Sequence, residues 1–149
     1  MATTLTIALA AAPGHQLAAD ALRNDLLIHG HIVSHITPHT ASSSPKDILL
    51  GEDQELFSQL TLLVGMADLL VLLLPADQNA ACLAGMADIS GVPVAAVESG
   101  TEQEHSFMLR GCVNFWCEDT SRLLEVIAEW PDLNEDSERD LWRAVREGE

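Results

Sequence analysis

Two carboxylates stand where this sequence most readily supports chemistry, each at or just beyond the end of an apolar run. Asp77 follows the run at 68–75, and Glu98 follows the run at 92–97. A carboxylate held beside a substrate acts as a nucleophile or as a general acid–base. Structural explanations also stay open. Negative charge before a helix is favoured by about 0.3–1 kcal/mol, which suits Asp77, and Glu98 can be an ordinary strand-end carboxylate.

Histidines form the second group of candidates. His31 and His35 would share one face of a strand, because side chains alternate along it. A structural zinc site needs four ligands and usually includes cysteine, but the three cysteines lie far away in the sequence. We therefore expect no metal site and a solvated strand face. His15 is a candidate ligand contact. The GxGxxG, Walker A, GxSxG and HExxH motifs are absent from the sequence, and no cofactor is expected.

These residues lie in a chain that alternates short apolar runs with amphipathic stretches. Strands are expected at 4–11, 31–37, 68–75, 92–97 and 112–116. Helices are expected at 15–29, 56–64, 79–90 and 102–110, then from N-cap residues 119–121 to 130, and at 136–146. The buried stripe of the first helix is expected to contain Leu17, Ala21, Leu22 and Leu26, and Gly30 to cap that helix.

Strand–helix alternation at this spacing predicts an α/β three-layer sandwich with a five-stranded parallel, flavodoxin/Rossmann-like sheet of order 2-1-3-4-5. Ligands of such sheets bind beyond the carboxyl ends of the strands, where the winding direction reverses. That point lies between the first and third strands. The predicted site residues are Ala10, Ala12, Gly14 and His15 from the first loop, and Pro75, Asp77 and Asn79 from the third.

The segment 75–87, PADQNAACLAGMA, resembles the nucleoside 2-deoxyribosyltransferase-like family. In that family an Asp begins the preceding strand, as Asp68 does here, and a second Asp lies in the loop, as Asp77 does. The nucleophilic Glu stands six residues later in the pattern Glu-x-Gly-x-Ala, where this sequence has Leu83, followed by Gly85 and Ala87. The resemblance covers roughly residues 4–127. The aromatic residue that stacks on the base in the family has no counterpart at 10–13.

The resemblance implies a pocket for a nucleoside- or nucleotide-type ligand, but Leu83 has no lone pair with which to attack an anomeric carbon. A non-catalytic binding domain is therefore the first hypothesis, with Asp68 and Leu83 among its ligand contacts. The alternatives are a protein–protein assembly module and an N-glycosidic hydrolase that uses Asp77 or Glu98. Two placements of Leu83 stay open: it faces the ligand crevice, or it packs in the core with Ala80 and Ala87. In the first placement Ala84 and Ala87 face the sheet, and Gly85 allows close packing.

The composition of the chain disfavours some classes of binding partner. The chain has 149 residues, 48% of them hydrophobic, and 23 acidic against 7 basic residues give a net charge of −16. Binding to nucleic acid or to anionic membranes is disfavoured because both kinds of binding depend on Lys and Arg. The longest apolar run, 67–76, has about half the length that a membrane span needs. The apolar N-terminus lacks the basic residues of a signal peptide. The odd cysteine count fits a reducing compartment, so we expect a cytoplasmic protein.

One main domain is expected at 1–130, followed at 131–149 by an acidic linker and a C-terminal helix packed on the domain or on a partner subunit. The family is typically oligomeric, with neighbouring subunits completing one another's sites. Both the helix from Phe57 to Met66 and the terminal helix around Trp142 carry more apolar residues than one sheet face needs. We therefore expect a homodimer or a higher oligomer with isologous symmetry.

Overall fold

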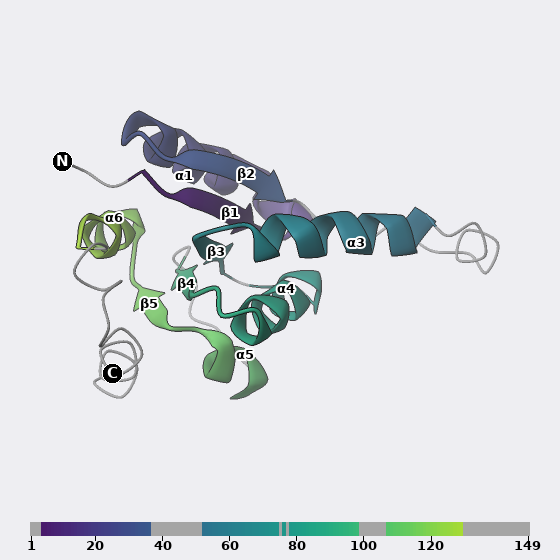
Figure 1. Ribbon diagram of the computed structural model, residues 1–149. Coiled ribbons are helices and arrows are strands. Elements are labelled where there is room, and N and C mark those ends of the chain that lie inside the picture. Colours follow the sequence, from purple (N-terminus) through teal and green to yellow (C-terminus); the bar gives the residue numbers. More distant parts are fainter. Residues whose placement is uncertain (1–3, 37–51, 75, 77, 99–106, 130–149) are drawn as a thin grey trace.

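The computed structural model describes residues 4–36, 52–74, 76, 78–98 and 107–129. Within them the chain forms one parallel sheet of five strands in the order β2-β1-β3-β4-β5, as the sequence predicted (Figure 1). The strands are β1 (Thr6–Ala10), β2 (Ile32–Ile36), β3 (Leu69–Leu73), β4 (Val94–Val97) and β5 (Phe115–Cys117). Every residue of β3 is buried, which explains its uninterrupted apolar sequence: a central parallel strand is covered on both faces.

Helices cover both faces of the sheet, and the three-layer architecture is confirmed (Figure 1). On one face α1 (Gln16–Ile28) and α6 (Thr120–Ala128) pack on the side chains of Ile7 and Leu9. On the other face α3 (Glu52–Gly65), α4 (Gln78–Ile89) and α5 (Phe107–Cys112) pack on Ala8 and Ala10. The alternation of Ile7, Ala8, Leu9 and Ala10 along β1 thus serves two separate hydrophobic clusters. The short 3₁₀ helix η1 (Pro13–His15) precedes α1.

The buried stripe of α1 differs from the prediction. Ala19, Leu22 and Leu26 are buried, whereas Leu17 is 87% exposed and Ala21 is also exposed. The apolar residues of this helix form two stripes, and the stripe with spacing i, i+3, i+7 is the one that faces the sheet. Gly30 ends the helix as predicted. Its φ of 89° suits glycine, and the N–H of His31 reaches back to the Leu26 carbonyl at 3.2 Å.

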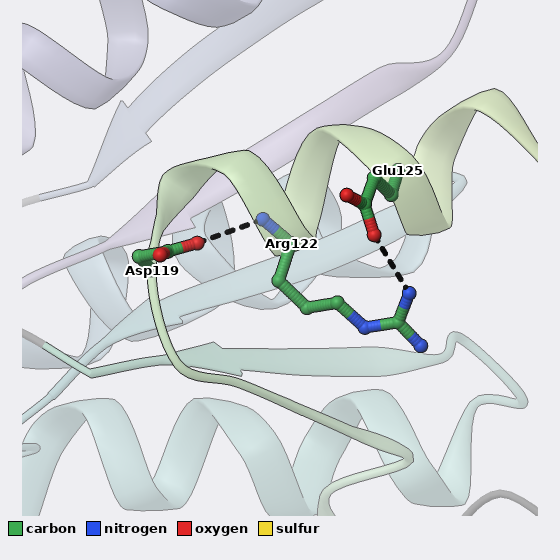
Figure 2. A network of polar contacts seen from close by, with 3 residues as sticks. All are labelled: Asp119, Arg122 and Glu125. Carbon is green, nitrogen blue, oxygen red and sulfur yellow. Dashed lines mark hydrogen bonds and ion pairs between the residues drawn. The ribbon is translucent and has the colours of Figure 1, made fainter.

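The boundary between α5 and the last strand also moved, whereas the predicted N-cap of α6 is confirmed. Cys112 ends α5 and does not begin the last strand, which starts at Phe115. α6 begins after Asp119, whose side chain accepts a hydrogen bond from the Arg122 N–H at 2.9 Å, as an N-cap residue should (Figure 2). Arg122 also pairs with Glu125 at 3.0 Å on the exposed side of α6, a contact of the kind that adds little stability.

The expected acidic linker and terminal helix at 131–149, including Trp142, lie outside the described residues. In the described part of the chain, no helix is both long and apolar enough to span a membrane.

Candidate functional site

The first wall of the predicted site is the segment from Ala10 to His15, at the carboxyl end of β1. Ala10 is buried, and Ala12 is half-buried at the N-cap of η1. The His15 N–H donates to the Ala12 carbonyl at 3.0 Å, which turns the chain from β1 into α1. Gly14 is exposed, and a Cβ placed on it would meet nothing within 4 Å. The structure therefore brings Ala10, Ala12, Gly14 and His15 together at one edge, with open space above Gly14.

The start of α1 lies at this edge. Its first turn contains no acidic residue, and its N-cap residue, His15, makes no side-chain cap hydrogen bond. The start of a helix carries a partial positive charge. This arrangement suits an acceptor group on a ligand.

The second wall follows β3, which is adjacent to β1 and pairs Leu72 with Ala10. Leu74 is buried and its N–H donates to the Val97 carbonyl at 2.8 Å. Ala76 and Asn79 are half-buried, and the first turn of α4 contains no acidic residue. Pro75 and Asp77, the two other residues predicted for this wall, lie outside the described residues.

Glu98 stands one strand further along the same edge. It directly follows β4, is half-buried, and its N–H donates to the Cys117 carbonyl at 2.9 Å. Because the strands are parallel, this carboxylate lies at the carboxyl edge with Ala10–His15. Of the two candidate catalytic acids, Glu98 is the one whose position the structure describes.

Leu83 occupies the second of the two placements that the sequence left open. It is only 3% exposed and belongs to the cluster on the α3–α4 side of the sheet. Ala80, Leu83, Ala84 and Ala87 are all buried there, and their spacing of i, i+3, i+4 and i+7 defines the sheet-facing stripe of α4. Leu83 lies in the middle of that stripe, so its side chain packs in the core and not at an open crevice.

Gly85 does not provide the close packing on the sheet that was expected of it. A Cβ placed on Gly85 would meet no atom of the described residues within 4 Å. The residue lies on the side of α4 away from the buried stripe, where Ala81 is half-buried and Cys82 is exposed. Intrachain packing therefore does not require glycine at this position.

Asp68 lies at the opposite edge of the sheet from the other predicted ligand contacts. Its Oδ2 accepts a hydrogen bond from the Thr6 N–H at 2.8 Å, at the start of β1. Ala10, four residues along the strand, is about 13 Å away at roughly 3.3 Å per residue. The structure thus does not bring Asp68 to the carboxyl edge, and it gives this side chain a role in joining β1 to β3.

Two more hydrogen bonds of the same kind lie along the amino edge of the sheet. The Asn114 Oδ1 accepts the Val94 N–H at 2.9 Å, and the His31 Nδ1 accepts the Leu5 N–H at 3.2 Å. In each case the residue just before one strand receives a backbone N–H at the start of its neighbour. These hydrogen bonds satisfy strand-end amides that the sheet ladder leaves unpaired. The sequence signal is a short polar side chain immediately before an apolar run.

His31 is buried, at 6% exposed, which corrects the expectation of a solvated strand face. Burial lowers the pKa of His31 below its ordinary value of 6.5, and His29 lowers it further. Because its Nδ1 accepts a hydrogen bond, the neutral ring carries its proton on Nε2. The side chain of His35 is outside the described part of the structure. In the part that is described, no three His, Cys, Asp or Glu residues gather closely enough to hold a metal ion.

Comparison with known proteins identifies the fold. No family model matches the sequence, and no curated protein is significantly similar to it. Among solved structures, a conserved protein from Enterococcus faecalis V583 is 19% identical with a TM-score of 0.59, and the match covers 86% of this chain and 99% of that one. A 2-deoxyribosyltransferase from Bacillus psychrosaccharolyticus is 20% identical with a TM-score of 0.53, over 79% of this chain and 89% of that one.

A third solved structure is also similar. The CMP N-glycosidase of Clostridium botulinum is 12% identical with a TM-score of 0.52, and the match covers 79% of this chain and 96% of that one. The chain therefore has a nucleoside 2-deoxyribosyltransferase-like fold, as the segment 75–87 predicted. At these identities the likeness establishes the fold, and the activity must be argued from this chain's own residues.

Proposed function

We propose that this chain binds a nucleoside- or nucleotide-type small molecule at the carboxyl edge of β1 and β3 and does not transfer its glycosyl group. The exposed Gly14, the start of α1 with no acidic residue in its first turn and the half-buried Asn79 support a ligand at this edge. Two of the solved structures with this fold carry nucleoside- or nucleotide-directed activities in their names. The partial positive charge at the start of α1 would attract an acceptor oxygen of the ligand.

The observation that carries the non-catalytic part of the proposal is Leu83. This residue stands where the resemblance places a nucleophilic Glu, and it is buried in the core stripe of α4. A leucine has no lone pair to attack an anomeric carbon, and a buried side chain at this position would not reach a ligand. Binding without covalent catalysis is the function that remains for a site of this kind.

One observation favours a second candidate function. Glu98 lies at the same edge as Ala10–His15 and is half-buried, as a general base for an N-glycosidic hydrolase would be. In that case water would attack the anomeric carbon directly, with no covalent intermediate. Release of the free base from a nucleoside, and its loss in Glu98→Gln, distinguishes hydrolysis from binding.

A thermal-shift panel of nucleosides, nucleotides and sugar nucleotides tests the binding proposal. A ligand at 100 times its dissociation constant adds about 2.7 kcal/mol of stability, which raises the melting temperature by several degrees in a domain of this size. At least one nucleoside or nucleotide is expected to give such a shift. If no member of the panel stabilises the protein, the proposal is wrong.

Gly14 offers a matched pair of variants for this panel. Gly14 is not one of the positive-φ glycines of the described chain, so an L-residue fits its backbone. Gly14→Phe should fill the open space and abolish the shift. Gly111→Phe places the same ring on α5, where a Cβ also meets nothing within 4 Å, and should leave the shift unchanged.

We also propose a cytoplasmic location. Cys82, Cys112 and Cys117 are all free thiols in the structure, and Cys82 is exposed. An exposed free thiol persists most readily in a reducing compartment.

A further inference from the structure

Glu98 lies at the same edge of the sheet as the proposed ligand site, at a distance over which its charge acts. β3 pairs with both β1 and β4, and the two registers place Glu98 level with Ala12, two strands away. Neighbouring strands are about 4.8 Å apart, so roughly 10 Å separates the backbones of these two residues. A charge at this distance changes the affinity for a charged ligand beside the first loop without touching it.

Most helix starts at the carboxyl edge are accompanied by acidic residues. A helix that connects two parallel strands begins near this edge and ends near the amino edge. The first four residues of α3 are EDQE, Asp77 directly precedes α4 in the sequence, and Asp119 caps α6. An acidic residue at a helix start offsets its partial positive charge, which is about half an elementary charge. Among the described helices of eight residues or more, only α1 begins without such a residue.

The described basic residues do not supply the missing positive charge. Arg110 is in the last turn of α5, which places it near the amino edge, where β5 begins. Arg122 is near the start of α6, but its side chain pairs with Glu125 at 3.0 Å (Figure 2). Arg23 is exposed on α1, about 10 Å from the start of that helix at 1.5 Å per residue. The chain's other basic residues lie outside the described residues.

The segments that follow three of the strands also contain no basic residue. The sequence has no Lys or Arg at 11–15 after β1, at 74–77 after β3 or at 98–106 after β4, and the last segment adds Glu102 and Glu104 to Glu98. A phosphomonoester carries a charge of about −1.5 to −2 at pH 7. Protein sites that accept such a group commonly offer it Arg or Lys. The half charge at the start of α1 suits an uncharged acceptor oxygen better than a dianion.

We propose that Glu98 determines the ligand class of this site: the site admits a nucleoside and excludes the 5′-monophosphate of the same nucleoside. The proposal rests on the proposed ligand binding at the carboxyl edge and narrows it from nucleosides and nucleotides to nucleosides. Glu98 acts here through its charge and transfers no proton, so this role is separate from that of a general base in hydrolysis.

Isothermal titration calorimetry of the full chain tests this selectivity with adenosine, guanosine, cytidine and thymidine, each compared with its own 5′-monophosphate. Titrations at pH 8 avoid the charge that histidines ordinarily carry at lower pH. One carboxylate about 10 Å from a dianion weakens its binding about 4-fold at the dielectric constant of water, and over about 100-fold at the effective value near a protein surface. In 50 mM NaCl we expect each nucleoside that binds to do so at least about 10-fold more tightly than its monophosphate. In 1 M NaCl the Debye length falls to about 3 Å, so the ratio should fall toward one.

Glu98→Gln keeps the shape of the side chain and removes its charge, so the ratio of the two dissociation constants should fall at least about threefold. Glu98→Asp keeps the charge and should keep the ratio. Glu129→Gln is the matched control, because it removes the same charge at the exposed C-cap of α6, near the amino edge, and should leave the ratio within about twofold.

The outcomes separate this selectivity from ligand binding itself. A wild-type ratio of one or less, or a ratio that neither Glu98→Gln nor 1 M NaCl lowers, would overturn the role of Glu98 and leave binding at the edge intact. An equal fall of the ratio in Glu129→Gln would also overturn it, as would loss of nucleoside binding in a folded Glu98→Gln variant. If the wild type binds neither the nucleosides nor their monophosphates, the proposed function is wrong, and the role of Glu98 with it.

Discussion

The burial of Leu83 makes a quantitative prediction, because this residue decides whether the nucleophile position of the resemblance faces a ligand or the core. Leu83→Ala removes a side chain that is only 3% exposed. Core substitutions of this type cost about 2–5 kcal/mol, and the cost is larger where neighbours cannot collapse into the space. The neighbours of Leu83 on α4 are alanines at 80, 84 and 87, which offer few atoms to fill it. We expect a loss of about 3–4 kcal/mol.

Leu83→Glu should be worse, and its effect should depend on pH. An unpaired buried carboxylate costs several kcal/mol, and burial raises its pKa above the unfolded value of about 4.3. A carboxyl group whose pKa is raised on folding destabilises the protein least when the pH is below its pKa in the unfolded state. The free energy of unfolding of the variant should therefore fall as the pH rises above that pKa. Leu83→Gln has a similar shape without the titration, so its cost should not show this pH dependence.

Urea unfolding followed by circular dichroism measures both effects. Ile89 provides the matched control: it lies on the same helix but is 89% exposed, so Ile89→Ala and Ile89→Glu should each change stability by less than about 0.5 kcal/mol. If Leu83→Glu is as mild as Ile89→Glu, the side chain faces solvent, and the packing described for α4 is wrong. Nucleoside cleavage by a stable Leu83→Glu variant would contradict the account still more directly.

Three further predictions concern the amino edge of the sheet and α6. Because burial lowers the pKa of His31, the unfolded state binds the proton more tightly than the folded state. The free energy of unfolding should therefore fall as the pH drops below 6.5. His31→Gln should remove that part of the pH dependence in unfolding experiments at pH 5 to 7. Asp68→Ala should cost about 1 kcal/mol by leaving the Thr6 N–H without its acceptor, while Asp68→Asn should recover most of the loss, and neither should alter the shift seen with the nucleoside panel. Asp119→Ala removes the N-cap of α6 and should lower the free energy of unfolding by about 1 kcal/mol, whereas Asp119→Ser should be nearly neutral; an equal loss in both would mean that the cap is not the cause.

The strand order could be predicted from the sequence because its signals are strong and local. Apolar runs such as 69–73 have the composition of buried parallel strands, and Gly30 and Gly91 end the helices before two of them with positive φ. A parallel sheet of such units has few permitted windings. The sequence therefore predicted correctly that the first loop and Glu98 lie at the carboxyl edge of the sheet.

The orientation of α4 could not be predicted in the same way. This helix is apolar or small at nearly every position from Asn79 to Ala87, so its sequence has no periodic contrast that marks one face. Whether Leu83 faced the ligand crevice or packed in the core depended on packing with β3 and α3. In α1 the difficulty was a second apolar stripe containing Leu17, which competed with the stripe that is buried.

The prediction that Asp68 contacts a ligand failed for a different reason, since the strand direction in the sequence already argued against it. A residue that precedes a strand lies at its amino edge, whereas ligands of parallel sheets lie at the carboxyl edge. The resemblance to a family motif placed Asp68 among the ligand contacts, although strand direction argued against it. The observed hydrogen bond to the Thr6 N–H follows from position alone.

Ligand-observed NMR tests the central claim most directly, because saturation transfer to the H1′ proton of a nucleoside or nucleotide reports binding and the H1′ integral reports cleavage. The account predicts saturation transfer to at least one compound in the wild type and in Gly111→Phe, its loss in Gly14→Phe, and an H1′ integral that is unchanged after a day. Transfer that persists in Gly14→Phe, the absence of transfer to every compound, or a growing signal from free base would contradict it.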